Sequence, residues 1–242
     1  MLNTEQQLQI HRQIEAYERE GKKGSLRVAV PLRSRSFLLE VKPFVANPTI
    51  MNSGLQVVEF LAARPELVKG KAVTDMGTGS GIIGIAAALL GASFVLMPDK
   101  DRQAVSCAEK NIKINGLVGC CLAFWSDLFS SLQDLQAADV QIFNHPFFAA
   151  EPIPDKPWTA MMLGGTELLG SYFEQAPLCS HRETIYILPW LVTASNDEEL
   201  DNDPGKRAGQ YGYEVLERVE MSPVGQGIQQ RPFVIYVLRH NG

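Results

Sequence analysis

The segment Asn144-His145-Pro146-Phe147 combines groups that could hold a nitrogen atom for reaction. The side-chain oxygen of Asn144 and the backbone carbonyl of His145 are two hydrogen-bond acceptors. Together they could take both N–H hydrogens of an amide or a ring amine and stabilise charge that grows on the nitrogen. Pro146 fixes its own φ and biases His145 towards an extended conformation, which aims that carbonyl. Phe147 could stack on a flat substrate.

The same four residues and Phe148 could instead serve the fold alone. Asn144 could cap a turn, and Phe147 and Phe148 could be core residues. The His145 ring could reshape a pocket, act as a base, or be tolerated without any function. The residue types therefore predict a catalytic clamp at residues 144–147, and they leave the role of the His145 ring open.

A glycine-rich stretch at residues 73–84 is the strongest local signal for ligand binding. A predicted strand delivers Asp75, and Gly77, Gly79 and Gly81 then alternate before a helix begins. Glycine permits positive φ and close approach of backbone to a ligand, and the helix N-terminus offers unpaired N–H groups. The second half of the stretch fits the Gly-x-Gly-x-x-Gly pattern of dinucleotide-binding loops. A tight turn without a ligand is the alternative.

The next predicted strand ends in a second binding candidate, Asp99, twenty residues beyond Gly79. A carboxylate at this strand end could accept both hydroxyls of a ribose, which would suit NAD or any other ligand that contains adenosine. Asp75 argues against a pyrophosphate, because its carboxylate would repel phosphate and attract an ammonium group. Asp101 fits better as a helix cap.

The order of predicted elements indicates the fold class. Alternating strands and helices imply a parallel sheet with helices on both faces. The last two strands follow each other without a helix, so they should pair antiparallel at that edge. Strands are predicted at residues 71–76, 93–97, 120–125, 140–143, 184–188, 214–221 and 233–238. Helices are predicted at residues 4–20, 53–63, 81–90, 101–115 and 165–176, with Thr4 and Ser53 as caps of the first two.

We therefore predict an α/β protein with a Rossmann-like, seven-stranded, mostly parallel sheet, an antiparallel last strand and helices on both faces. Residues 51–242 would form this domain. Residues 1–50 would form an N-terminal extension made of a helix and a hairpin. Residues 196–206 are predicted to be a solvated loop.

Composition limits the functional classes. The 242-residue chain is 45% hydrophobic and has a net charge of −5, which gives no support for nucleic-acid binding except through a local patch. Such a patch could lie in residues 1–50, which hold eight Lys/Arg and five Asp/Glu. Four cysteines without Cys-x-x-Cys spacing and four scattered histidines predict reduced thiols, a cytoplasmic location and no metal site. We expect neither a signal peptide nor a membrane span.

Taken together, these motifs resemble those of the class I S-adenosylmethionine-dependent methyltransferases. "VTDMGTGSGIIGIAAALLGA" (73–92) is similar to the first motif of that class, and "PDKDRQAVSCAEKNIKINGL" (98–117) to the second. "SDLF" (126–129) resembles the segment after the third strand. "VQIFNHPFF" (140–148) resembles the Asn-Pro-Pro-Tyr motif of the small-domain amino-methyltransferases, with histidine at the first proline and phenylalanine at the tyrosine. The resemblance covers about residues 45–240.

The resemblance implies S-adenosyl-L-methionine as the cofactor and assigns a role to each matching position. The glycines at 77, 79 and 81 would wrap its methionine and ribose, Asp75 would face its ammonium group, and Asp99 would hold its ribose hydroxyls. Asp127 would accept from the adenine amino group beside Leu128, although Asp127 could be an exposed turn residue and Leu128 simple core. The implied cofactor-binding set is Asp75, Gly77, Thr78, Gly79, Gly81, Asp99, Lys100, Asp127, Leu128 and Asn144.

The implied activity is N-methylation of an exocyclic amine on an rRNA or tRNA base. The related branch that modifies protein suggests a glutamine or lysine side chain as the alternative acceptor, and the acidic composition favours that alternative somewhat. An NAD-dependent enzyme and a cofactor-binding scaffold without turnover also stay open. The sequence does not name the acceptor or the oligomeric state.

Overall fold

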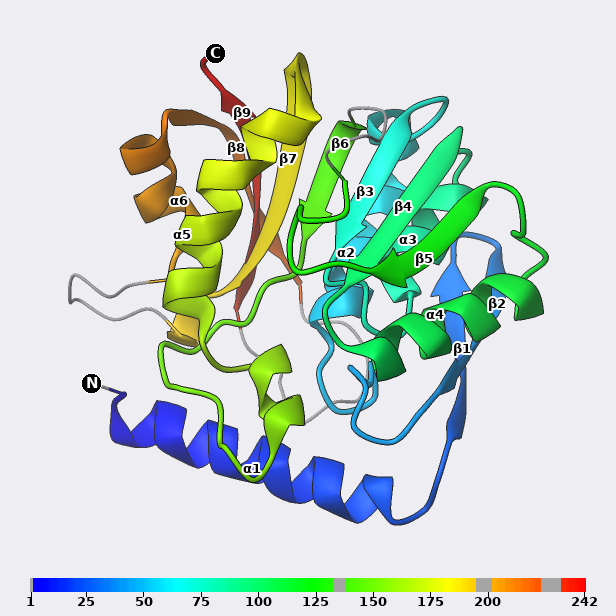
Figure 1. The fold of residues 1–242 in the computed structure, drawn as a ribbon, viewed down its shortest axis with the longest axis vertical. Coiled ribbons are helices and arrows are strands. Elements are labelled where there is room, and N and C mark those ends of the chain that lie inside the picture. Colours follow the sequence, from blue (N-terminus) through cyan, green and yellow to red (C-terminus); the bar gives the residue numbers. More distant parts are fainter. Residues whose placement is uncertain (1, 133–137, 195–201, 223–231) are drawn as a thin grey trace.

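The computed structural model describes residues 2–132, 138–194, 202–222 and 232–242, and most of the predicted loop at 196–206 lies outside them. A seven-stranded sheet has the order β5-β4-β3-β6-β7-β9-β8 (Figure 1). Its strands are β3 (Ala72–Met76), β4 (Phe94–Asp99), β5 (Cys121–Trp125), β6 (Ala138–Phe143), β7 (Ser180–Leu191), β8 (Tyr213–Met221) and β9 (Phe233–His240). Neighbours from β5 to β7 are parallel, and β9 is antiparallel to both β7 and β8. The predicted fold class is confirmed, with β9 inside the sheet between β7 and β8.

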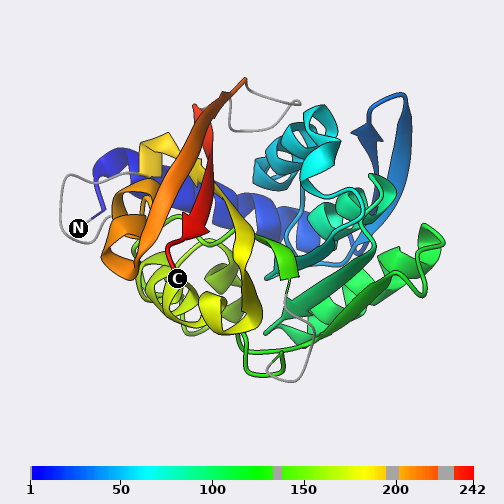
Figure 2. The ribbon, with the colours of Figure 1, turned by 90° about the horizontal axis from the view of Figure 1, so that it is seen from above.

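Helices cover both faces of this sheet (Figure 2). One core contains residues from α2 (Ser53–Ala63), α3 (Ile82–Leu89) and α4 (Arg102–Ile114), packed against sheet residues such as Val73 and Val95. The other core contains residues of α5 (Gly165–Gln175), packed against sheet residues that include Met76 and Leu96. Val95 and Leu96 are neighbours in β4 and enter different cores, because successive side chains of a strand point to opposite faces.

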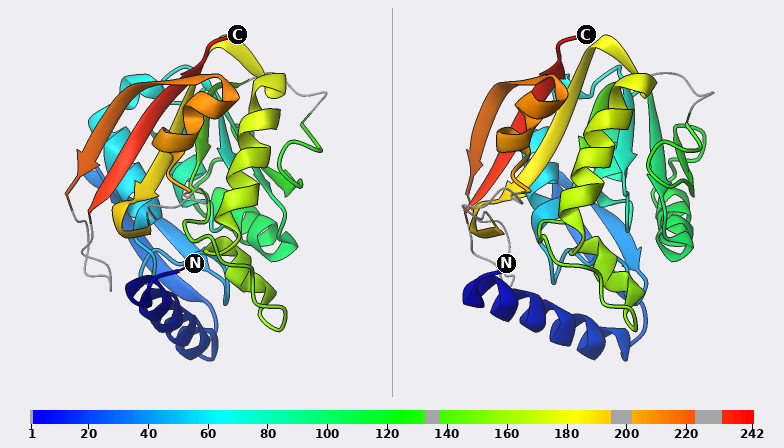
Figure 3. Two further views of the ribbon diagram at one scale, coloured as in Figure 1. Left: turned by 90° about the vertical axis from the view of Figure 1, so that its left-hand side faces the viewer. Right: turned by 60° about the vertical axis from the view of Figure 1, so that its left-hand side comes forward.

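The first part of the chain lies against the carboxyl-terminal edge of the sheet and against α4. Helix α1 (Thr4–Gly21) runs across the ends of the parallel strands (Figures 1 and 3). Strands β1 (Leu26–Leu32) and β2 (Arg35–Val41) form an antiparallel hairpin. Asn111 of α4 joins this hairpin to the glycine loop, because its side chain accepts from Glu40 N at 2.7 Å and donates to Ser80 O at 2.9 Å.

Two predicted helix caps are wrong by one residue. Asn3, not Thr4, caps α1, since its side chain accepts from the Gln6 backbone N–H while the Gln6 side chain accepts from the Asn3 N–H. This is a reciprocal capping box. Ser53 is the first residue of α2, and its hydroxyl is bonded elsewhere. The Asp101 cap is confirmed, because its carboxylate accepts from Gln103 N at 2.8 Å.

Two short helical elements lie in the connections between the longer ones. The 3-10 helix η2 (Pro157–Met161) follows the end of β6 and precedes α5, and α6 (Pro204–Arg207) precedes β8. Within the described ranges, no helix combines the length and the apolar character that a bilayer crossing requires.

Candidate functional site

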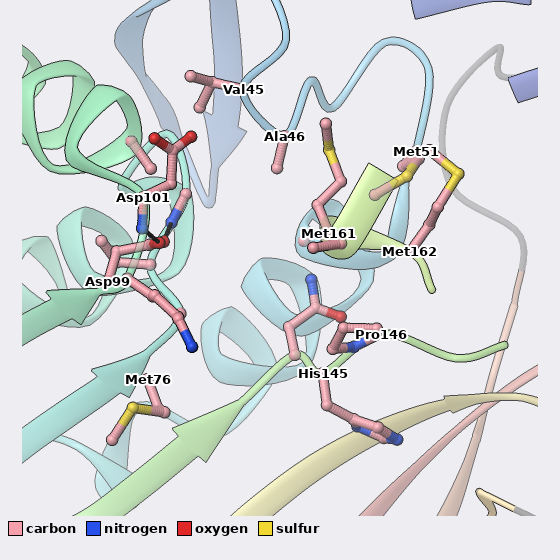
Figure 4. A pocket seen from close by; sticks show the side chains of 18 of the residues that line it. Val45, Ala46, Met51, Met76, Asp99, Asp101, His145, Pro146, Met161 and Met162 are labelled. Carbon is pink, nitrogen blue, oxygen red and sulfur yellow. Dashed lines mark hydrogen bonds between the residues drawn. The ribbon is translucent and has the colours of Figure 1, made fainter. Parts of the chain in front are cut away.

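A cavity of about 610 Å³ lies at the carboxyl-terminal ends of β3, β4, β5 and β6. This volume is within the range of sites for organic ligands. Four segments from those strand ends line it, together with residues from α1, from the segment between β2 and α2, and from η2. In Figure 4, Asp99 and Asp101 lie on one side of this cavity, and Met51, Met161 and Met162 lie on the other. The cavity therefore has a polar end and an apolar end.

The glycine loop forms part of the polar end. Gly77, Gly79 and Gly81 have φ of 63°, 57° and 86°, values that favour glycine. Gly77 and Gly79 line the cavity, together with Thr78. At Gly81 a Cβ atom would lie only 3.0 Å from Met97 Cε, so glycine is needed there for packing.

Asp75 stabilises this loop from inside the protein. Its Oδ2 accepts from Thr78 Oγ1 at 2.6 Å and from Gly84 N at 2.9 Å, and the residue is 1% exposed. Burial raises the pKa of Asp75 to about 7. Neither Asp75 nor Gly81 is among the residues that line the cavity. Both residues therefore shape the loop from behind the cavity wall, and the roles towards a ligand that the sequence predicts for them stay predictions.

Asp99, at the end of β4, lines the cavity. Its Oδ2 accepts from Gly79 N at 2.8 Å, and its Oδ1 accepts from Asp101 N at 2.9 Å. Each carboxylate oxygen can accept more than one hydrogen bond, so both keep capacity for ligand hydroxyls. Burial raises the pKa of Asp99 to about 6.

The segment after β5 closes the polar end. Asp127 pairs with Lys100 at 2.6 Å, with side chains 46% and 71% exposed, so this ion pair contributes little to stability and can open for a ligand. Leu128 lines the cavity with φ of 47°, which is strained for leucine. Ser126 fixes this conformation, because its hydroxyl donates to Leu128 O at 2.6 Å and accepts from Ser131 N at 3.1 Å.

The end of β6 brings Asn144 to the same cavity. Asn144 Nδ2 donates to Ser53 Oγ at 3.0 Å, whereas its Oδ1 is buried and has no hydrogen-bond partner among the described residues. An unsatisfied buried acceptor costs about 1–3 kcal/mol, so such an atom at a cavity suggests that a ligand supplies the donor.

His145 has a different environment from Asn144. Its ring is stacked parallel to Trp190 at 5.8 Å and is buried, and Figure 4 shows it directed towards β7, away from Asp99 and Asp101. Burial lowers the pKa of His145 to about 4, so the ring is neutral near pH 7. Of the roles left open by the sequence, this geometry favours a packing role for the ring.

Phe147 and Pro146 also line the cavity. The Phe147 ring meets Trp190 and Phe233 edge-on, at 5.7 Å and 5.5 Å. The Pro146 carbonyl closely approaches α5, because a Cβ atom on Gly165 would lie 2.1 Å from Pro146 O. The segment after β6 is therefore held from three sides.

Several lining residues have no counterpart among the predicted site residues. Gln13 of α1, Phe44 before α2 and Trp158 of η2 line the cavity. The Trp158 ring is stacked on Phe44 at 5.3 Å and lies 5.4 Å from Tyr17. These residues carry no local motif. Gln13 alone had a possible signal in the sequence, because it belongs to a row of glutamines along one face of the helix at 4–20.

The solved structures with a similar fold include several methyltransferases. A 16S rRNA methyltransferase of T. thermophilus, solved in complex with AdoMet and guanosine, superposes with a TM-score of 0.65 over 90% of this chain and 51% of its own, at 17% identity. A ribosomal protein L11 methylase from Lactobacillus delbrueckii subsp. bulgaricus gives a TM-score of 0.55 over 84% of each chain, also at 17% identity. The chain thus has the fold of these methyltransferases, and its glycine loop and the end of β6 lie where the sequence predicts a binding site.

Within this class, the sequence is similar to one group in particular. The family model "Ribosomal protein L11 methyltransferase (PrmA)" matches residues 54–144. The ribosomal protein L11 methyltransferase of Thermotoga neapolitana is 36% identical over 209 residues, which cover 86% of this chain and 65% of that protein. The one from Carboxydothermus hydrogenoformans is 40% identical over 108 residues, or 44% of this chain and 34% of that protein. The chain thus spans less than two thirds of the length of these relatives.

Proposed function

We propose that this protein transfers a methyl group from S-adenosyl-L-methionine to a nitrogen atom of a protein side chain. The observation that carries the proposal is that one cavity contains both the glycine loop with Asp99 and the Asn144 amide with its unsatisfied oxygen. The cofactor supplies the electrophilic methyl group. The chain must then bind it, bring the acceptor nitrogen in line and exclude water, and positioning of this kind can supply roughly 7–11 kcal/mol.

The polar end of the cavity fits the cofactor. The backbone of Gly77, Thr78 and Gly79 would contact its methionine part, and the Asp99 carboxylate has acceptor capacity for two ribose hydroxyls. The adenine ring would pack against the apolar side chain of Leu128. Asp127 would accept from the adenine amino group once its ion pair with Lys100 opens, so both residues are proposed to contact the ligand. Gly81 and Asp75 would support this loop from behind.

The end of β6 would hold the acceptor. Asn144 Oδ1 and the carbonyl of His145 would take the N–H hydrogens of the reacting nitrogen, and Phe147 would flank it. Pro146 would fix the direction of that carbonyl. Charge that grows on the nitrogen would then meet oriented acceptors in a site shielded from water.

Two observations favour protein as the acceptor. The curated relatives are named for a ribosomal protein substrate. In addition, the charged residues that line the cavity, within the described part of the chain, are Asp99, Lys100, Asp101 and Asp127. This acidic set does not attract a polyanion. An rRNA or tRNA base amine is the second candidate, supported by the guanosine-bound neighbour and by the flat surface that Phe147 offers.

The decisive experiment measures transfer of labelled methyl groups from the cofactor to cell extract. We expect protease treatment to remove the label and RNase treatment to leave it. The opposite result would assign RNA as the acceptor. No transfer, together with cofactor binding in calorimetry, would indicate a scaffold without turnover. A protein that binds nicotinamide cofactors instead would contradict the proposal altogether.

Asn144→Ala separates binding from catalysis in the same assay. We expect S-adenosylmethionine binding to stay near the wild-type value and turnover to fall about 100-fold, because one transition-state contact is lost. Asp99→Ala is the matched variant and should weaken cofactor binding in calorimetry. Wild-type turnover in Asn144→Ala would eliminate the acceptor clamp.

A further inference from the structure

Asn202 contacts the segment after β6 on both sides of Pro146. Its side-chain Nδ2 donates to Phe147 O at 3.2 Å, and its backbone O lies 3.4 Å from His145 Nε2. Because a carbonyl oxygen only accepts, the His145 ring is the donor in this contact and carries its hydrogen on Nε2. Asn202 is 2% exposed and is not among the described residues that line the cavity. It therefore holds this segment from behind the cavity wall.

The position of Asn202 is fixed by the residues that follow it. Asp203 caps α6, because its carboxylate accepts from Gly205 N at 2.9 Å, and it also accepts from the Tyr236 hydroxyl of β9 at 3.3 Å. Asp203 is 7% exposed, so this described end of the loop that the sequence predicts to be solvated is buried instead. Asn202 thus connects the segment after β6 to α6 and, through it, to β9.

Helix α5 leaves room for this contact at its first residue, Gly165. A Cβ atom on Gly165 would lie 2.8 Å from Asn202 Nδ2 and 2.1 Å from Pro146 O. A larger residue there would displace the Asn202 amide and the backbone after β6, since a packed interior has no space for atoms at such distances. The absence of a side chain on Gly165 therefore lets Asn202 reach the segment.

The segment needs such a restraint because of the residue at position 145. The direction of the His145 carbonyl depends on the backbone angles of that residue. A proline ring would fix φ at about −65°, whereas histidine leaves φ free. Pro146 restricts His145 to extended geometry but does not select one orientation within it. The contacts of Asn202 with residues 145 and 147 supply a restraint that the local chain lacks.

We propose that Asn202 is a positioning residue for methyl transfer, which directs the His145 carbonyl towards the acceptor nitrogen through the His145 ring and the Phe147 carbonyl. This inference rests on the proposed function. Asn202 contacts neither the cofactor nor the acceptor and acts only through the segment after β6. It restrains position 145 as a proline ring there would, so a proline at 145 should make the Asn202 amide unnecessary.

Asn202→Leu tests this role, because it removes the Nδ2 donor and keeps the branched shape of the side chain. We expect the rate of labelled methyl transfer from saturating S-adenosylmethionine to RNase-treated cell extract to fall about tenfold, the effect of one lost hydrogen bond to a buried group. The Kd for S-adenosylhomocysteine, measured by calorimetry, should not change. Asp203→Asn is the matched control on the same segment. It keeps a capping side chain and should leave both quantities unchanged.

A proline background separates positioning from a structural role. In His145→Pro the same Asn202→Leu substitution should lower the transfer rate by about twofold at most, because the ring now fixes φ. An unchanged rate in Asn202→Leu, an equal loss in both backgrounds, or a parallel weakening of S-adenosylhomocysteine binding would each overturn the inference.

A crystal structure of Asn202→Leu gives a readout that needs neither the acceptor nor the proline variant. We expect the His145 carbonyl to turn away from its wild-type direction, and an unchanged direction would overturn the inference. Absence of methyl transfer by the wild-type protein would instead contradict the proposed function, and the crystal structure would still decide whether Asn202 orients the segment.

Discussion

Single side chains at this site gain their roles from neighbours that are distant in sequence. Asn144 shows this most directly, since its amide is held by Ser53, 91 positions earlier in the chain. Because Ser53 Oγ accepts from Nδ2, the amide is oriented with Oδ1 free to accept from a ligand. Which of the two amide atoms faces the acceptor therefore depends on one hydroxyl group. Ser53 is in this sense a positioning residue.

This dependence predicts the behaviour of Ser53→Ala. Without the hydroxyl, the Asn144 amide can rotate, so we expect kcat to fall about tenfold while the Kd for S-adenosylmethionine is unchanged. Ser53→Thr keeps the hydroxyl and should restore kcat. Calorimetry and steady-state kinetics give the two quantities. If the alanine variant had normal kcat, or if threonine failed to rescue it, Ser53 would have only a structural role.

The role of the His145 ring could not be predicted from the sequence for the same reason. Its burial comes from Trp190 on β7, 45 positions later, and no local pattern encodes that contact. Asp75 is a similar case. Its position ahead of the glycines predicts that it faces a ligand, and its bonds to Thr78 and Gly84 show a second role, support of the loop, that the sequence does not reveal. Local sequence specifies which groups are present, and tertiary contacts decide which way they face.

The elements themselves were largely predictable, because each depends on local signals. Strands β3 and β4, the glycine loop and α4 follow from short apolar runs, glycine spacing and the Asp101 cap. The position of β9 between β7 and β8 was not predictable. The short connection from β8 to β9 predicts that these two strands pair with each other, but not which of them pairs with β7. The part of the cavity wall that α1 and η2 form was not predicted either. Tyr17 and Trp158 pack together there, although they are more than 130 positions apart in the sequence.

The glycine loop predicts a pH dependence of cofactor binding. Burial raises the pKa of Asp75 to about 7 and of Asp99 to about 6. S-adenosylmethionine carries a net positive charge, so its affinity should be higher when Asp99 at the cavity and Asp75 behind the glycine loop are both ionised. Affinity should therefore fall as the pH falls through 7 and then 6, by about tenfold between pH 8 and pH 6. Calorimetry at several pH values measures this directly.

The free protein should show the opposite trend in stability. A carboxyl group whose pKa is raised on folding binds more protons in the folded state, so it contributes stability that is lost as the pH rises through the folded pKa. For Asp75 and Asp99 this loss falls mainly between pH 4 and 7. Asp99→Asn removes one titrating group and should flatten the pH dependence of cofactor binding. An affinity for S-adenosylmethionine that does not change between pH 6 and pH 8 would contradict this account.

The molecule as a whole surrounds the cavity with two parts of the chain. The division at residue 50 into an extension and a methyltransferase domain stays a prediction, but the contacts show how closely the parts are joined. Glu18 of α1 forms an ion pair with Lys156, next to η2. The hairpin residues Val30 and Leu39 lie in the same core as α2, α3 and α4. Residues of α1 and of the segment after β2 are therefore part of the wall of the site, and the hairpin is part of the core beneath it.

The position of Phe44 makes this coupling testable. Phe44 has φ of 61°, a strained value for phenylalanine, and its ring lines the cavity against Trp158. It is held there because Gly21, the last residue of α1, leaves room for the ring. A Cβ atom on Gly21 would lie 2.6 Å from Phe44 Cζ. The end of α1 thus sets the position of the Phe44 ring in the cavity wall.

Gly21→Ala should displace the Phe44 ring and raise the KM for the acceptor several-fold, although alanine favours the helix itself by about 1 kcal/mol. In a Phe44→Leu background the clash is absent, so the same glycine substitution should have almost no effect on KM. This double-mutant cycle isolates the contact between the two residues. Additive effects of the two substitutions would mean that α1 does not shape the cavity through Phe44.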